Sequence, residues 1–194
     1  MAAAMSRLPP LPRDALDPSG QALWDTLAAT RGAGVVGTEG GLIGPFNAFV
    51  TAPEVGTRLA DLGGILRFQT SIDRRLLEIA IITVGARWQS EFEWWAHARM
   101  AREHDVRDDV IDAIARGDDP PFVRDDERTV HAVAVQLGTS GRIDAETYAA
   151  AQALLGDAGM VELVALCGYY TLICFTLNAF EVPLPPGAVP TWPR

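Results

Sequence analysis

Apolar residues in this chain recur at helical spacing, and no segment shows the strict alternation of apolar and polar residues that marks a half-buried strand. This pattern favours helices throughout. The chain has 194 residues, which is enough for one domain with a substantial core. We therefore predict an all-α protein, a compact multi-helix domain with no internal linker.

Glycine and proline divide the pattern into eight expected helices. The glycine-rich stretch 31–49 lacks a neighbouring strand and is predicted to be a loop rather than a dinucleotide-binding turn. The tail VPLPPGAVPTWPR is predicted to be extended and to wrap a surface or a neighbouring subunit. The predicted helices cover residues 17–31, 53–67, 73–88, 90–104, 106–116, 125–137, 144–155 and 159–180.

The charged residues exclude several classes of function. The chain has 25 acidic and 16 basic residues, and every basic residue is arginine. Without lysine there is no Schiff-base chemistry, no lysine-anchored pyridoxal phosphate and no Walker-type phosphate loop. A net charge of −9 and the absence of a basic run argue against a nucleic acid or an anionic membrane as partner.

The two cysteines and the N-terminal residues indicate a cytoplasmic protein. Cys167 and Cys174 would lie on one helix face roughly 10 Å apart, too far for a disulfide, and are interpreted as buried thiols in a reducing compartment. Residues 1–18 lack the basic start and apolar run of a signal peptide. The apolar segment 160–180 reaches the lower edge of membrane-spanning length and is interpreted as a buried helix at the core or a subunit interface.

Glu78 stands out because it lies in LLEIAIITV, a segment that is apolar around the whole helix and hence buried. A buried carboxylate needs a partner or a raised pKa. One interpretation is an ion pair with Arg74 or Arg75. The other is a carboxyl group held at a pocket to move protons.

Glu93 and His97 lie four residues apart and therefore share a helix face. A carboxylate beside an imidazole suits a general acid or base. Two alternatives remain open. Ser90 and Glu93 fit a capping box, in which Glu93 returns to the Ser90 backbone, and Glu93 and His97 with a third ligand would suit a metal. His131 is interpreted as a packed core histidine.

These residues in order, RRLLEIAIITVGARWQSEFEWWAHARMAREHDV followed by RDDVIDAIARG, resemble the carboxymuconolactone decarboxylase-like superfamily, which also contains alkylhydroperoxidase D. The resemblance extends from GPFNAF and APEV to the long apolar helix. It implies an alkylhydroperoxidase D-like helical domain over 41–182, preceded by an N-terminal arm and helix over 1–40 and followed by a proline-rich tail over 183–194. It also implies a homotrimer or homohexamer.

In the peroxidase branch of this superfamily, a glutamate is followed by Cys-x-x-Cys-x-x-x-His. By spacing, Glu78 matches the glutamate and His97 the histidine, while Ser90 and Glu93 stand at the two cysteine positions. Neither Ser nor Glu can form a sulfenic acid or a disulfide. The resemblance therefore implies the decarboxylase-type branch, and thiol peroxidase activity through this site is not expected.

The decarboxylase branch implies a lyase that needs no cofactor or metal and acts on a small carboxylated lactone or ring in aromatic degradation. On this resemblance Glu78, Glu93 and His97 are the expected catalytic residues. The expected substrate-binding residues are Phe46, Asn47, Ser90 and Trp94. Arg74, Arg75 or Arg87 would supply a cation for the developing enolate.

Two other functions remain open at this stage. One is a hydroperoxide reductase or redox protein of the family type. The other is a non-catalytic oligomeric binding protein on the same scaffold, in which the polar residues only cap and pair. The expected partner is a small carboxylic acid substrate, with neither nucleic acid nor membrane involved.

Overall fold

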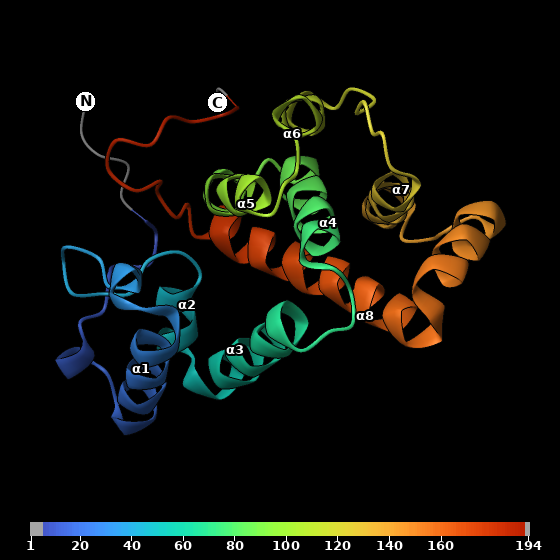
Figure 1. Cartoon of the computed structure of the whole chain (residues 1–194). Coiled ribbons are helices and arrows are strands. Elements are labelled where there is room, and N and C mark those ends of the chain that lie inside the picture. Colours follow the sequence, from blue (N-terminus) through green and yellow to red (C-terminus); the bar gives the residue numbers. More distant parts are fainter. Residues whose placement is uncertain (1–5, 193–194) are drawn as a thin grey trace. The chain divides into compact units, whose positions relative to one another are not determined.

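A computed structural model describes residues 6–192 and shows an all-α chain (Figure 1). The predicted fold class is confirmed. Within the described residues, the one β-type pairing is an isolated bridge between Val36 and Leu42 in the glycine-rich loop. The helices are α1 (Pro18–Arg31), α2 (Phe46–Thr51), α3 (Pro53–Phe68), α4 (Arg74–Arg87), α5 (Glu91–Glu103), α6 (Asp108–Arg116), α7 (Asp125–Ser140) and α8 (Ala145–Ala179), with single 3-10 turns at Arg13–Ala15 and Ala33–Val35.

The chain forms two compact units rather than the predicted arm, domain and tail. Of the described residues, the first unit comprises 6–65 and 176–183, and the second comprises 66–175 and 184–192. Helices α3 and α8 each contribute to both units, and the predicted division at residues 40 and 182 stays a prediction. The first five residues of the predicted arm and the last two of the tail lie outside the described residues.

Side-chain caps and glycines set the helix ends close to their predicted places. Asp17 accepts a hydrogen bond from the Gly20 N–H at 2.7 Å at the start of α1, and Asp73 accepts one from the Arg75 N–H at 2.9 Å at the start of α4. Gly117 ends α6 in the left-handed conformation, with φ of 72°.

The last two predicted helices form one element with a break. Gly156 has φ of 67° and ψ of 179° inside α8, a conformation that glycine adopts without steric cost. The break falls between the predicted helices 144–155 and 159–180. The two predicted helices are thus present, but they follow each other without a loop.

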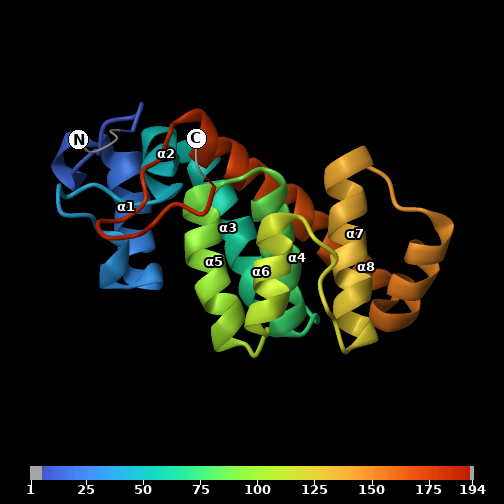
Figure 2. The same cartoon turned by 90° about the horizontal axis from the view of Figure 1, so that it is seen from above.

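Helix α4 is the centre of the second unit and packs against α5, α6 and α7 (Figure 2). All ten residues from Leu76 to Gly85 are buried. The apolar side chains among them lie in one core cluster with apolar residues of the neighbouring helices and of α8, such as Val133 and Leu163. A helix buried on every side holds whatever polar group it carries inside the protein, and α4 carries Glu78.

Helix α8 is long and apolar enough to cross a membrane, with a mean hydropathy of 1.8 over its most apolar window. Half of that window is buried inside the protein. Leu163, Leu166 and Cys174 on it are fully buried core residues. These contacts favour the predicted core helix over a membrane span. Cys167 and Cys174 are both free and buried, as expected.

The proline-rich tail contacts its own chain. Both carboxylate oxygens of Glu91, at the start of α5, accept backbone N–H groups, from Thr191 at 2.8 Å and from Trp192 at 2.7 Å. The Trp192 ring packs against Trp94, and its indole N–H donates to the Ala115 carbonyl at 3.0 Å. The predicted wrapping of a surface is confirmed for the surface of α5 and α6.

Candidate functional site

Three side chains that the sequence singled out meet inside the second unit. His97 Nδ1 lies 2.7 Å from Glu78 Oε2 and is hydrogen-bonded to it. On the opposite side of the ring, His97 Nε2 lies 3.1 Å from Glu93 Oε1. All three side chains are buried, Glu78 completely. We call Glu78, His97 and Glu93 the Glu–His–Glu cluster.

The α4–α5 pair positions this cluster. Glu78 lies in the first half of α4, while Glu93 and His97 are one turn apart on the face of α5 that packs against it. The turn between the helices is short because Gln89 adopts φ of 46° and the Ser90 N–H returns to the Gly85 carbonyl at 3.0 Å. The two helices therefore lie side by side, with the imidazole between the two carboxyl groups.

Arg74 is the arginine that pairs with Glu78. Its Nη2 lies 3.1 Å from Glu78 Oε1, and its Nη1 donates to the carbonyl of Arg67 at the end of α3. Arg75 points to α7 instead, where it pairs with Asp126 and Glu127. The sequence left the choice between Arg74 and Arg75 open, and the structure selects Arg74.

The surroundings shift the two carboxyl groups in opposite directions. Burial by itself would raise the pKa of Glu78, but the hydrogen bond from His97 and the charges of His97, Arg74 and Arg67 outweigh it, so the pKa is lowered. Burial dominates at Glu93 and raises its pKa, although His97 and Arg67 oppose the shift. Glu78 is therefore the ionised acid of the pair, and Glu93 is the acid that tends to keep its proton.

Two residues of this region are not identifiable from the sequence pattern. Tyr170 of α8 packs edge-on against the His97 ring with centroids 5.1 Å apart, and burial raises its pKa well above the usual value. Arg67, in the last turn of α3, acts electrostatically on both carboxyl groups. Both residues are far from the cluster in sequence, so no local spacing could have indicated them.

Ser90 and Trp94, two of the predicted substrate-binding residues, also lie near the cluster. Ser90 is fully buried and its side chain makes no capping hydrogen bond to α5, so the alternative capping box is not formed. Burial raises the pKa of the Cys174 thiol, and the Ser90 hydroxyl lowers it by a smaller amount. The two side chains therefore lie together. Trp94 is a buried core residue in contact with Trp192.

Phe46 and Asn47, the other two predicted substrate-binding residues, belong to the first unit. Asn47 uses both ends of its amide to hold the N-terminal arm: Nδ2 donates to the Pro9 carbonyl and Oδ1 accepts from the Leu11 N–H, each at 3.0 Å. Phe46 packs against Phe49. Because these groups already have partners in their own unit, Asn47 acts as an anchor for the arm.

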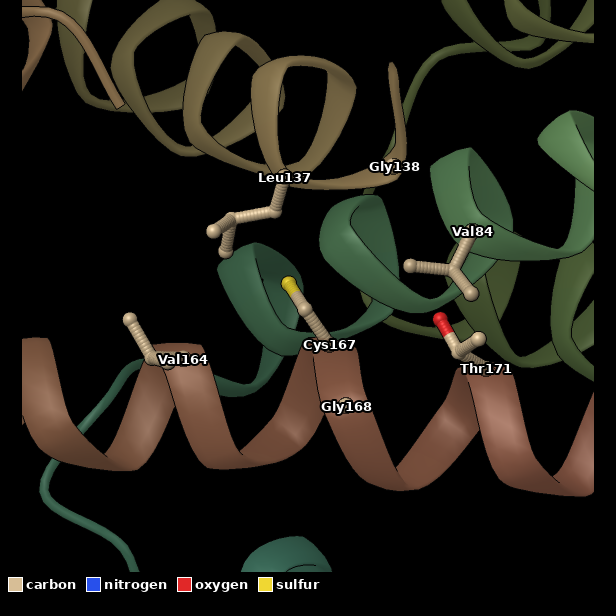
Figure 3. A pocket seen from close by; sticks show the side chains of 7 residues that line it. All are labelled: Val84, Leu137, Gly138, Val164, Cys167, Gly168 and Thr171. Atoms are coloured by element: carbon tan, nitrogen blue, oxygen red, sulfur yellow. The ribbon is translucent and has the colours of Figure 1, made fainter. Parts of the chain in front are cut away.

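A cavity of about 230 Å³ lies elsewhere in the second unit, between α4, α7 and α8. Figure 3 shows the side chains of Val84, Leu137 and Thr171 around it, with the Cys167 sulfur pointing up from α8 between them. Burial raises the pKa of that thiol to about 12. No charged side chain and no member of the Glu–His–Glu cluster lines this cavity, so its lining suits an apolar group rather than a carboxylate.

Comparison with known proteins finds a family similarity in the middle of the chain. Residues 53–137 match the profile of the Carboxymuconolactone decarboxylase family, and this range contains the whole Glu–His–Glu cluster. This match agrees with the resemblance to the carboxymuconolactone decarboxylase-like superfamily that the sequence motifs indicate. No curated protein matches the sequence.

Two solved structures of alkylhydroperoxidase D-like proteins share the fold. An uncharacterised peroxidase-related protein from Ralstonia eutropha, described as an alkylhydroperoxidase AhpD core, is 14% identical with a TM-score of 0.71, and 95% of each chain is covered. A protein of unknown function from Agrobacterium tumefaciens is 13% identical with a TM-score of 0.65, covering 72% of this chain and 96% of that one. At this identity the likeness establishes the fold alone.

Within the matched residues 53–137, Ser90 and Glu93 hold the positions where, by the resemblance, the peroxidase branch carries cysteines. The structure puts Glu93 against His97 and Ser90 in the adjoining interior. Across the described residues no set of three His, Cys, Asp or Glu side chains is arranged to hold a metal ion. The chemistry that these residues themselves can supply is the movement of protons between a carboxyl group and an imidazole.

Proposed function

We propose that the Glu–His–Glu cluster is the proton-transfer site of a cofactor-independent carboxy-lyase. Its substrate would be a small carboxylated lactone or ring, which loses carbon dioxide and takes up a proton on carbon. The family supports the scaffold, and the replacement of both family thiols by Ser90 and Glu93 favours the decarboxylase-type reaction over peroxide reduction.

The observation that carries this proposal is the contrast between the two carboxyl groups on either side of one imidazole. His97 faces Glu78 at 2.7 Å and Glu93 at 3.1 Å, and the pKa of Glu78 is lowered while that of Glu93 is raised. Two acids whose surroundings separate their pKa values mark an assignment of acid and base roles. Glu93 is then the proton donor, and Glu78 orients the imidazole.

The reaction follows from these roles. Ionised Glu78 accepts the Nδ1–H of His97 and thereby leaves Nε2 facing Glu93. When the carbon–carboxylate bond breaks, carbon dioxide departs and its bonding electron pair remains on the ring as an enolate. The proton shared by Glu93 and His97 then passes to carbon. The net change is one carboxylate and one proton converted to carbon dioxide and a C–H bond.

We further propose a cytoplasmic homotrimer or homohexamer. Free cysteines persist in a reducing compartment, and burial raises the pKa of both Cys167 and Cys174, which keeps them as inert thiols. Val161, Val164 and Phe175 are exposed along the second-unit part of α8. An apolar helix face of this kind is typical of a contact between subunits.

The test is release of carbon dioxide from a panel of small lactone and ring carboxylates by wild-type protein, H97Q and H104Q. His104 ends the same helix and provides a matched control. We expect H97Q to lose about 10²- to 10⁴-fold in turnover, the usual contribution of a positioned proton-transfer group, and H104Q to match wild type. Circular dichroism and size-exclusion chromatography check that the variants fold and assemble alike.

Two results would contradict the proposal. The first is a wild-type protein that releases no carbon dioxide from any member of the panel while H97Q only loses stability, which would assign the cluster a structural role. The second is reduction of a hydroperoxide with a dithiol donor that persists in the C167S/C174S double variant, which would assign the site a peroxide chemistry without cysteine.

A further inference from the structure

The charges around the Glu–His–Glu cluster do not balance. Arg67 and Arg74 each carry a positive charge, and ionised Glu78 carries a negative one. Glu93 Oε1 lies 3.1 Å from His97 Nε2, and burial raises the pKa of Glu93, which favours its uncharged form. The site therefore has a surplus positive charge, in a chain whose net charge is −9. Such a surplus attracts an anion.

Arg74 is already committed to the protein. One of its terminal nitrogens pairs with Glu78, and the other donates to the Arg67 carbonyl, one of the last carbonyl groups of α3 that have no partner within the helix. These contacts use the guanidinium to join α3 to α4. They also fix the backbone that carries Arg67.

Arg67 has donors left over. Its Nη2 donates to the Met100 thioether at 3.1 Å, and thioether sulfur is a weak acceptor. Its Nε is buried and has no hydrogen-bond partner. In the part of the chain that the structure describes, no carboxylate lies within ion-pairing distance of this guanidinium. A buried guanidinium N–H without an acceptor is costly, so an acceptor supplied from outside would be bound favourably.

The position of Arg67 suits a ligand of the cluster. Met100 lies three residues beyond His97 and seven beyond Glu93, so all three side chains project from one face of α5. The charge of Arg67 lowers the pKa of Glu78 and opposes the rise at Glu93 and Tyr170, which shows that it acts on the site. Unlike the three side chains of the cluster, Arg67 is partly exposed, although its Nε is buried.

We propose that Arg67 is the carboxylate-binding residue of this site, holding a small organic acid beside His97 and Glu93 through the donors that the protein leaves unpaired. The identity of the ligand as the substrate rests on the proposed function; the binding itself does not. Arg74, Arg75 and Arg87 are excluded from this role by their own partners, respectively Glu78, the acids of α7 and the Gly138 carbonyl.

The experiment measures binding rather than turnover. Isothermal titration calorimetry at low ionic strength compares benzoate and a γ-lactone carboxylate, each with its neutral amide, on wild-type protein, R67M, R67K and R58M. Arg58 is an exposed arginine of the same helix, so R58M removes an equal charge away from the site. Thermal denaturation confirms that each variant is folded.

We expect at least one carboxylate to bind wild type and R58M equally and to bind R67M about 10- to 100-fold more weakly, the effect of losing a hydrogen bond between charged groups. The carboxylate affinity of R67K should lie between those of wild type and R67M, because an ammonium group keeps the charge but lacks the planar fork of donors. The amides should bind weakly and equally to all four proteins. During turnover, R67M should raise KM more than it lowers kcat.

Three results would overturn this inference: equal carboxylate affinity of R67M and wild type, equal affinity of wild type for an acid and its amide, or no carboxylate binding at all. Adding H97Q separates the two proposals. If H97Q binds the carboxylate as wild type does but no protein releases carbon dioxide, the proposed function fails and the Arg67 site stands. If carbon dioxide is released with an unchanged KM in R67M, the function stands and the Arg67 site fails.

Discussion

Arg74 and Arg75 are neighbours on α4, yet they serve two regions of different kinds. Arg74 faces α5 and pairs with Glu78, which continues to His97 and Glu93. Arg75 faces α7 and pairs with Asp126 and Glu127 in its first turn. Both regions bring acids and an arginine into the interior between two helices. They differ in what else each contains.

In the α7 region, the acids Asp126 and Glu127 are matched by arginines. Arg124 adds a second cation to Asp126 at 2.7 Å, and the pKa of Asp126 is held far below its usual value, mainly by that hydrogen bond and with help from Arg75. The α5 region contains an imidazole, an acid with a raised pKa and an arginine with unpaired donors. A region whose charges are all matched stabilises the fold, whereas one with an imidazole between two carboxyl groups and an arginine with an unpaired donor is suited to chemistry.

The largest effect is expected for E93Q, which keeps the shape of Glu93 but removes its proton. Turnover should fall about 10²- to 10⁴-fold. A general acid works while it is protonated, so wild-type activity should fall as pH rises through the raised pKa of Glu93, and E93Q should lack this dependence. The measurement is a pH profile of carbon dioxide release. E103Q, an exposed acid on the same helix, is the control and should leave the profile unchanged.

The second effect should appear in stability rather than activity. R75M leaves Glu127 buried without its cation, and breaking a buried pair costs roughly 3–5 kcal/mol. We expect the lower end of this range, because Asp126 keeps Arg124. R124M removes an exposed arginine and should cost less than about 1 kcal/mol. Urea denaturation measures both. If R75M abolished turnover while stability stayed unchanged, it would be wrong to assign a stabilising role to the α7 face of α4 and chemistry to its α5 face.

A third effect concerns acid stability and arises at His131 on α7. Burial lowers its pKa from 6.5 to about 4. The unfolded chain therefore binds the proton first, and stability present above pH 6.5 is lost as pH falls towards 4. The full loss is up to about 3 kcal/mol. H131Q should flatten this part of the curve of unfolding free energy against pH, measured by urea denaturation at a series of pH values. An unchanged slope would show that other groups cause the acid sensitivity.

The smallest effect is expected for S90A. The buried Ser90 hydroxyl does not cap α5 and has only the Cys174 thiol, a weak partner, beside it, so its removal should change the unfolding free energy by less than about 0.5 kcal/mol. A residue that capped α5 would cost about 1 kcal/mol on the same replacement. D73A, which removes the observed cap of α4, is the matched comparison and should show that larger loss in thermal denaturation. A similar loss in S90A would restore the capping interpretation.

Much of the fold could be predicted because its signals are local. The 3.6-residue periodicity, Asp17 and Asp73 at helix starts and Gly117 at a helix end each act within a few residues, so they are legible in the sequence. The meeting of Glu78 with His97 was also foreseeable, because α4 and α5 are consecutive and joined by a short turn. The division into two units was not, because α3 and α8 contribute to both.

By itself the sequence determined an all-α chain with an acid inside an apolar helix and a carboxyl–imidazole pair on the next one, because helix periodicity and spacing are properties of neighbouring residues. Only the tertiary structure decided that Arg74 rather than Arg75 meets Glu78, that Asn47 holds the arm, and that Arg67 reaches Met100 with donors unpaired. These outcomes depend on which helix faces which, and on where burial leaves a polar atom without a partner. Packing between distant segments sets both.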